Sequence, residues 1–299
     1  MTRRDLEHSN ANDLLRRHAH GIYAGTGLPD EEKLPEVLAL LQGLTIGTPR
    51  VASFDTAATL WGLLHGELHP PFHLSSPAKG CRTERPQLVI GHRIKIPEQF
   101  VTELHGVRVT DPAWTWLDLS LRGSKERAVV LGDQVIRHPR REYGEPGERL
   151  AAIEDLRAAV RVRGRTRGIC HVREALELIR EGVDSPQETR LRYYMHLAGL
   201  PEPRVNPVIH HASGYPWFQP DLAVKEFQVS IQYEGEEFHS TPASVRKDVR
   251  RSEITEELGW LEVRITRDHM EDQGRRAVAR IQRALAQRGW RPRNYPPQS

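Results

Sequence analysis

The sequence is poor in cysteine, in aromatic residues and in long apolar runs. Its two cysteines, Cys81 and Cys170, lie far apart and form no Cys-x-x-Cys spacing. Neither a disulfide framework nor a cysteine-based zinc site is therefore supported. No apolar run approaches the roughly 20 residues that a membrane-spanning helix needs. The N-terminal residues also lack the apolar segment of a secretory signal. These absences predict a cytoplasmic protein without a membrane partner.

The chain is long enough for two domains, and arginine dominates its positive charge. Of the 299 residues, 38% are hydrophobic and 28% are charged, which leaves enough apolar residues for a core in each half. The formal net charge is +3, and the sequence pI is about 8.9. Arginine binds phosphate groups through bidentate hydrogen bonds. The composition fits a protein that contacts nucleic acid, and it fits an arginine-rich solvated surface equally well.

The first half of the chain alternates between helical and strand-like patterns. A helix is expected over residues 5–17, followed by a short strand. A helix that runs into a basic β-ribbon is the way a winged helix-turn-helix ends, so residues 1–25 are either a remnant of that unit or a frayed basic terminus. Residues 70–76 and 87–96 alternate like the two strands of a hairpin around a basic turn. These patterns predict an α+β domain over residues 1–136.

An arginine-rich stretch follows at residues 137–183, where a linker and a helix are expected. From its start to Arg173 it holds ten arginines against five acidic residues. The densest part contains Arg163, Arg165 and Arg167, which we interpret as a stripe that faces duplex DNA. The alternative is the solvated face of a helix and its loop.

The pattern of the second half predicts helices that flank a mixed sheet. Ser185-Pro186-Gln187-Glu188 has the spacing of a capping box, so a helix is expected to begin there. Strands at residues 221–224 and 228–233 form a hairpin, and a helix separates them from the next strand. The order α-β-β-β-α-β-α predicts an α/β domain over residues 184–288, with a flexible tail at residues 289–299.

Oxygen-bearing side chains gather at the end of this hairpin. Asp221 lies at the start of the first strand, and Gln232 and Glu234 lie at the end of the second. Because residues two apart on a strand share a face, Gln232 and Glu234 can meet Asp221 at one ion. Mg²⁺ or Mn²⁺ prefers such oxygens and activates water for attack on a phosphodiester. The alternative is that these three are ordinary turn and strand-end residues.

Residues from about 184 to 285 resemble the Vsr-like PD-(D/E)XK endonuclease domains. The matching landmarks are Ser185-Pro186-Gln187-Glu188, Arg192, Gly199-Leu200-Pro201, Pro220-Asp221-Leu222, Gln232-Tyr233-Glu234-Gly235, His239, Asp248, Arg251, Gly259-Trp260 and Val263-Arg264-Ile265-Thr266. The resemblance implies a restriction-endonuclease-like α-β-β-β-α-β core. It also implies that Glu188 is a fourth metal ligand, unless it only caps its helix. His239 would relay a proton from the attacking water, unless it packs on Trp260.

The site departs from the pattern of that family. Relatives commonly have Glu and Asp where this chain has Gln232 and Glu234, so the site has one negative charge fewer. No lysine occupies the usual third position of the E-x-K motif. The resemblance therefore allows an active site of weakened metal affinity or a degenerate site that only binds DNA. Lys247, Arg250 and Arg251 are further candidates for phosphate contact.

The first half is similar to the AbiEi-like antitoxins of type IV toxin–antitoxin systems. The landmarks are Gly21-Ile22-Tyr23, Ala57-Ala58, Leu60-Trp61-Gly62, Val109-Thr110, Leu117-Asp118-Leu119 and Gly132-Asp133. Most of these are packing and turn residues, so the resemblance implies a fold more than a chemistry.

Two functional hypotheses follow. The first is a DNA endonuclease or nickase that depends on Mg²⁺ or Mn²⁺, with Asp221, Gln232, Glu234 and His239 as its catalytic residues. The alternative is a non-catalytic DNA-binding regulator, similar to a type IV antitoxin, with a degenerate nuclease domain. Duplex DNA is the expected partner in both cases, and a cognate toxin is a further partner in the second.

Overall fold

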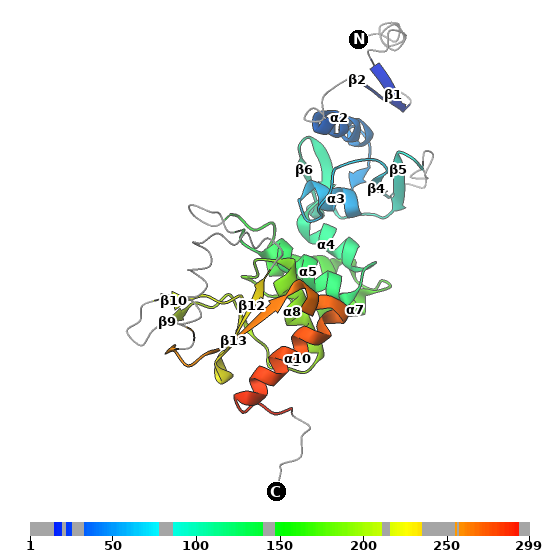
Figure 1. Ribbon diagram of the computed structural model, residues 1–299. Helices are drawn as coiled ribbons and strands as arrows, with labels where there is room; N and C mark the ends of the chain where they lie inside the picture. Colours follow the sequence, from blue (N-terminus) through cyan, green and yellow to red (C-terminus); the bar gives the residue numbers. More distant parts are fainter. Residues whose placement is uncertain are drawn as a thin grey trace, which may run out of the picture. The chain divides into compact units, whose positions relative to one another are not determined.

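A computed structural model of the chain separates into two units by mutual contact (Figure 1). The described residues are 15–19, 22–25, 33–77, 86–139, 147–210, 216–234, 255 and 257–292. Unit 1 is made of Met1–Gly123 and Leu150–Val172, and unit 2 of Ser124–Arg149 and Arg173–Ser299. The domain boundaries drawn from the sequence stay predictions. Among the described helices, none combines the length and apolarity that crossing a membrane requires.

Unit 1 is built on a five-stranded sheet with the order β5-β4-β3-β7-β6. The strands are β3 (Val51–Ala52), β4 (Phe72–Ser76), β5 (Val89–Arg93), β6 (Val101–Leu104) and β7 (Val107–Thr110). The helical elements are α2 (Lys33–Thr45), α3 (Phe54–Leu60), η2 (Glu98–Phe100), α4 (Pro112–Ser120) and α6 (Ile153–Arg163). Leu41 of α2 packs with Phe72, Leu74 and Val109 of the sheet in one apolar core.

The pairing of β4 with β5 corrects the predicted hairpin. The two strands run parallel, with Phe72 opposite Val89. Parallel neighbours need a crossover connection rather than a tight turn, so β4 and β5 do not form a hairpin. The alternating pattern predicts that these segments are strands, but it carries no information on their relative direction. The basic turn predicted at residues 79–85 lies outside the described residues.

A two-stranded ribbon precedes this sheet in the chain. β1 (Leu15–Ala19) pairs antiparallel with β2 (Ile22–Gly25), and α2 lies against β2. The short strand predicted in this region is confirmed. The helix predicted through Arg17 is wrong for residues 15–17, because their backbone pairs with β2. The remainder of that predicted helix lies outside the described residues.

α4 is buried along its whole length and begins at a well-formed cap. Asp111 Oδ1 accepts a hydrogen bond from the backbone N–H of Trp114 at 2.7 Å, and Pro112 occupies the first turn. α3 and α6 both pack on α4. A helix covered on all sides must find internal partners for its polar side chains, which makes Asp118 on α4 conspicuous.

Unit 2 contains a mixed four-stranded sheet with the order β13-β12-β11-β8. Its strands are β8 (Arg204–Val205), β11 (Leu222–Val224), β12 (Val229–Glu234) and β13 (Leu261–Thr266), and β9 (Ile209–His210) and β10 (Pro216–Phe218) form a separate pair. β12 and β13 run parallel, whereas β11 is antiparallel to both of its neighbours. The predicted α/β class with a mixed sheet is confirmed.

The described helices of unit 2 include the first and the last of those predicted for the second half. They are α5 (Lys125–Ile136), α8 (Pro186–Leu197) and α10 (Glu271–Gln287), with short 3-10 turns η3 (Lys225–Phe227) and η4 (Arg267–Met270). α7 (Ile169–Leu176) runs from the end of unit 1 into unit 2. α8 packs against α5 and α10, and α10 also packs on β12 and β13 (Figure 1). The helix predicted between β12 and β13 lies almost wholly outside the described residues.

A left-handed turn fixes the start of α10 against α8. Asp272, Gln273 and Gly274 all have positive φ angles, and the regular helix follows them. A Cβ atom placed on Gly274 would lie 2.4 Å from Cδ2 of Tyr194. Glycine is therefore required here both by the backbone conformation and by the ring packed against it.

The replacement Gly274→Ala should destabilise the protein more than Gly289→Ala, which is its matched control. Gly289 also has a positive φ of 87°, but a Cβ atom there meets nothing within 4 Å. We expect Gly289→Ala to cost about 1 kcal/mol from backbone strain alone, and Gly274→Ala about 1–3 kcal/mol more from overpacking. Urea unfolding measures both free energies. Equal losses for the two variants would contradict the packing of Tyr194 on Gly274.

Candidate functional site

The hairpin of β11 and β12 brings Asp221 and Gln232 into contact. Leu222 is opposite Ile231, which places Asp221 and Gln232 across from each other at the end of the ladder. Gln232 Nε2 donates to Asp221 Oδ1 at 2.8 Å, and the backbone N–H of Tyr233 donates to Oδ2 at 2.7 Å. Both oxygens of the carboxylate thus accept hydrogen bonds from β12. In this arrangement Gln232 presents its amide N–H groups to Asp221.

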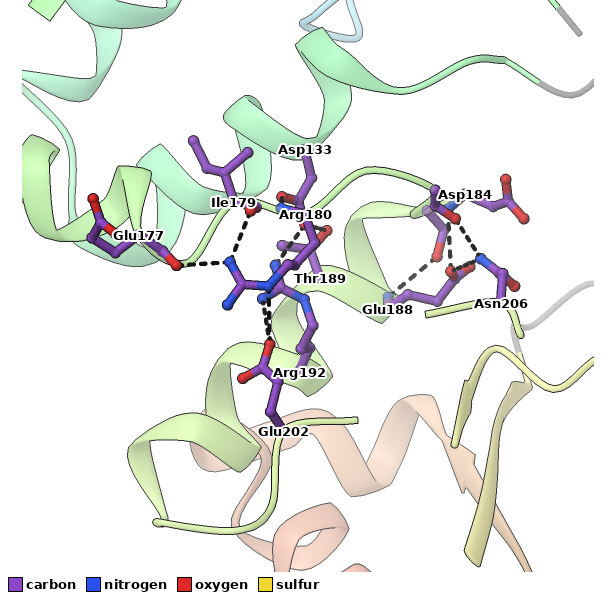
Figure 2. Close-up of polar contacts among 12 residues, drawn as sticks. Asp133, Glu177, Ile179, Arg180, Asp184, Glu188, Thr189, Arg192, Glu202 and Asn206 are labelled. Atoms are coloured by element: carbon purple, nitrogen blue, oxygen red, sulfur yellow. Dashed lines mark hydrogen bonds and ion pairs between the residues drawn. The ribbon is translucent and has the colours of Figure 1, made fainter. Parts of the chain in front are cut away.

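Glu188 holds the N-terminal end of α8. Ser185 Oγ accepts from the backbone N–H of Glu188 at 3.2 Å, which caps the helix. The Glu188 carboxylate accepts from the backbone N–H of Asp184 at 3.2 Å and from Asn206 Nδ2 at 3.1 Å (Figure 2). Burial raises the pKa of Glu188, and the negative charge of Asp221 acts in the same direction. The capping alternative therefore has direct contacts, and the proposed metal-ligand role stays a prediction.

Glu234 faces the neighbouring parallel strand. Its Oε1 lies 3.3 Å from Arg264 Nη1, and Arg264 also bonds to Glu262. The positive charge of Arg264 offsets the negative charge of the Glu234 carboxylate, which would otherwise attract a metal ion. Within the described part of the chain, no three His, Cys, Asp or Glu side chains are arranged to hold a metal. Ligation of Mg²⁺ or Mn²⁺ by Asp221, Gln232, Glu234 and Glu188 remains a prediction from the sequence.

The remaining predicted residues of this site cannot be placed. His239, Lys247, Arg250 and Arg251 lie outside the described residues. The structure adds two groups that the sequence reasoning missed, Asn206 beside Glu188 and Arg264 beside Glu234. Arg264 belongs to one of the landmarks named above, and Asn206 lies directly before a proline, as in a turn.

A buried ion pair joins α5 to α8. Arg192 Nη2 lies 2.8 Å from Asp133 Oδ2, and both side chains are almost completely inaccessible to solvent. The same carboxylate accepts from Thr189 Oγ1 at 2.8 Å and from the backbone N–H of Arg180 at 2.8 Å. Figure 2 shows these donors converging on Asp133, with Glu202 on the other side of Arg192. Three donors thus satisfy a carboxylate whose charge would otherwise be very unfavourable in the interior.

In unit 1, Arg163 turns toward the interior. Its Nη1 lies 3.9 Å from Asp118 Oδ1, and its guanidinium lies over the ring of Trp114 at 5.4 Å. Arg165 and Arg167, by contrast, are exposed. Of the three arginines predicted to face DNA, the structure thus leaves these two on the surface.

Asp118 is a buried acid with unusual surroundings. Neither of its carboxylate oxygens has a hydrogen-bond partner among the described residues. Burial raises the pKa of Asp118 to about 7, against the opposing influence of the Arg163 and Arg122 guanidiniums. This side chain therefore changes charge close to neutral pH, in the interior of unit 1.

Two hydrogen bonds and one longer ion-pair contact connect Arg122 to Asp55 through two histidines. Arg122 Nη2 donates to His92 Nδ1 at 3.2 Å, and His92 Nε2 lies 3.0 Å from His73 Nδ1. Because arginine only donates, His92 carries its proton on Nε2 and donates to His73. The Nε2–H of His73 then points toward Asp55 Oδ2 at 3.8 Å, beside a cavity of about 250 Å³. Burial lowers the pKa of both histidines, that of His92 to about 4.

Comparison with known proteins places similarity over both units. The AbiEi antitoxin C-terminal domain family matches residues 50–168, which contain the Asp118 and His73–His92 networks. "Uncharacterized protein Rv2248" of Mycobacterium tuberculosis strain ATCC 25618 / H37Rv is 32% identical over 289 residues, covering 95% of this chain and 97% of its own. "Uncharacterized protein MT2308" of strain CDC 1551 / Oshkosh gives the same values. No solved structure matches the chain significantly. The antitoxin resemblance is confirmed over residues 50–168, and none of these matches supports the nuclease resemblance.

Loss of Arg192 should be far more damaging than loss of Arg190, a partly exposed residue on the same helix. Arg192→Ala leaves the Asp133 carboxylate buried without its cation, which costs about 3–5 kcal/mol of unfolding free energy. Arg190 pairs with Glu126 at a partly exposed position, so Arg190→Ala should cost less than about 1 kcal/mol. Denaturant unfolding of the two variants makes the comparison. Similar losses would show that the buried pair does not hold α5 to α8.

Asp118 should make stability fall as the pH rises. Its folded pKa of about 7 lies above the unfolded value of 3.8, so the folded state binds more protons between these values. We expect Asp118→Asn to gain stability relative to wild type from about pH 4 to about pH 7, by about 4 kcal/mol at most. Unfolding free energies across this range measure the difference. A difference that does not change with pH would contradict the buried, unbonded carboxyl.

Proposed function

We propose that this chain is a DNA-binding regulator of the toxin–antitoxin type. The chain belongs to the family of the two mycobacterial proteins, and it contains an AbiEi antitoxin C-terminal domain. The antitoxin domain over residues 50–168 is the observation that carries this proposal. A cognate toxin is then a second partner, in addition to DNA.

The exposed arginines at the end of the antitoxin domain support contact with DNA. Arg165 and Arg167 follow α6 and extend into solvent, where guanidiniums can bind phosphates in bidentate fashion. Arg163 instead points toward the interior of unit 1, where it contacts Asp118 and Trp114. One arginine therefore anchors the loop while its two neighbours stay available for a ligand.

The ribbon of β1 and β2 gives further support. Its sequence carries Arg16 and Arg17, and its antiparallel pairing matches the wing expected at the end of a winged helix-turn-helix. Basic ribbons of this kind contact the sugar-phosphate backbone. The DNA surface that we propose thus includes the ribbon and the loop after α6.

We assign Asp221 a structural role within this proposal. Its two oxygens accept hydrogen bonds from Gln232 and from the backbone of Tyr233, so it fixes the end of β12. Glu234 is paired with Arg264, and Glu188 caps α8. These contacts favour a non-catalytic second unit over the metal-dependent endonuclease that the sequence resemblance implies. Cleavage by this unit is the outcome that the next experiment is designed to detect.

DNA binding should survive Asp221→Ala and be weakened by the double variant R165Q/R167Q. We expect binding that falls steeply with salt, because phosphate contacts release counterions, with a slope reduced by about 2 in R165Q/R167Q. The matched control is R108Q/R157Q, which removes two arginines of unit 1 that pair with acids. Fluorescence anisotropy with a labelled random-sequence duplex measures the affinities.

A parallel assay incubates supercoiled plasmid with wild type and Asp221→Ala in Mg²⁺ or Mn²⁺. We expect no nicking by either protein. Metal-dependent nicking that disappears in Asp221→Ala would overturn the non-catalytic assignment. Failure of wild type to bind any duplex would overturn the regulator proposal itself.

A further inference from the structure

α10 carries a row of arginines with no acidic residue among them. From the start of its regular helix to its last residue, the charged side chains are Arg275, Arg276, Arg280 and Arg283. All four are exposed. The acids of this element, Glu271 and Asp272, precede the regular helix.

The helical repeat places three of these arginines on one line. Arg276, Arg280 and Arg283 are spaced i, i+4 and i+7, so they share one face and span about 10 Å along the axis. Ala277, Ile281, Ala284 and Leu285 are buried in the core of unit 2 and fix the other side of the helix. The row is therefore turned to solvent by the packing of α10.

These arginines differ from several other arginines of unit 2 that do pair with acids. Arg149 pairs with Glu181, Arg180 and Arg192 with Glu202, Arg190 with Glu126, and Arg264 with Glu234. Over the part of the chain that the structure describes, no ion pair involves Arg275, Arg276, Arg280 or Arg283. Unpaired positive charge is thus concentrated on the solvent face of one helix.

This row of like charges destabilises α10 when no ligand is bound. Like charges at i+3 and i+4 repel, at a cost of about 0.2–0.5 kcal/mol for each pair. Arg275 and Arg276 also lie in the first turn of the regular helix, where the helix dipole disfavours cations. A polyanion bound along the row would offset the repulsion between these arginines and their unfavourable interaction with the helix dipole.

We infer that the row Arg276–Arg280–Arg283 of α10 binds the phosphate backbone of duplex DNA. Phosphates of one strand follow each other at about 3.4 Å along the duplex axis, so the row is long enough to reach about three of them. The left-handed turn at Gly274 and its contact with Tyr194 hold α10 in place, so the row is ordered before DNA arrives. This inference rests on the proposed function, to which it adds a contact surface in unit 2.

The triple variant R276Q/R280Q/R283Q tests the row. The control R127Q/R149Q/R190Q removes equal charge from other positions of unit 2, and R276K/R280K/R283K keeps the charge of the row. Thermal unfolding first establishes that each variant is folded. Anisotropy with a labelled random-sequence duplex, measured over a series of KCl concentrations, then gives the affinity and its salt dependence.

We expect R276Q/R280Q/R283Q to bind at least about tenfold more weakly and to lower the salt slope by about 2–3. The control and the lysine variant should bind nearly as wild type does. The inference is overturned if the glutamine variant binds like wild type, or if the control loses as much affinity. In either case duplex binding that is lost in R165Q/R167Q still upholds the proposed function, whereas a wild type that binds no duplex overturns both.

Discussion

The organisation of unit 2 depends on the buried pair of Asp133 and Arg192. The pair joins α5 to α8 where both side chains are inaccessible, so its geometry leaves little freedom to either helix. α8 in turn carries Glu188, which holds the chain before the helix, and Tyr194, which packs on Gly274 at the start of α10. The sheet and α10 are thus positioned through a helix that one ion pair anchors. The Asp133 carboxylate connects the two helices directly, because it accepts from Thr189 and Arg192 of α8.

The same backbone geometry serves catalysis or structure according to which atoms point into the site. A hairpin that ends in Asp221 and Gln232 has the outline of a metal site, and the structure does bring these side chains together. Gln232 donates an amide N–H to the Asp221 carboxylate in this arrangement. Arg264 adds positive charge beside Glu234. The arrangement of strands therefore does not by itself identify the activity of this unit.

Local patterns predicted much of the fold, whereas features set by distant partners were not predictable. The cap at Ser185 and the hairpin of β11 and β12 follow from signals within a few residues. The parallel direction of β4 and β5 depends on how the rest of the sheet is assembled, and no spacing encodes it. Arg163 belongs to a run of arginines that a sequence pattern treats as equivalent, and only the position of Asp118 on α4 separates it from Arg165 and Arg167. The Asp133–Arg192 pair joins residues 59 positions apart, so the sequence shows two unexplained charges on apolar helices but not that they meet.

The division into two units limits where the protein can be truncated. The chain passes between the units after Gly123, after Arg149 and after Val172, so each unit is discontinuous in sequence. The antitoxin domain at residues 50–168 includes α5, which nevertheless belongs to unit 2 through its pair with α8. A truncation at any single position therefore removes part of both units or leaves one with a missing segment. The two units alternate along the polypeptide, so neither of them corresponds to one continuous segment of the chain.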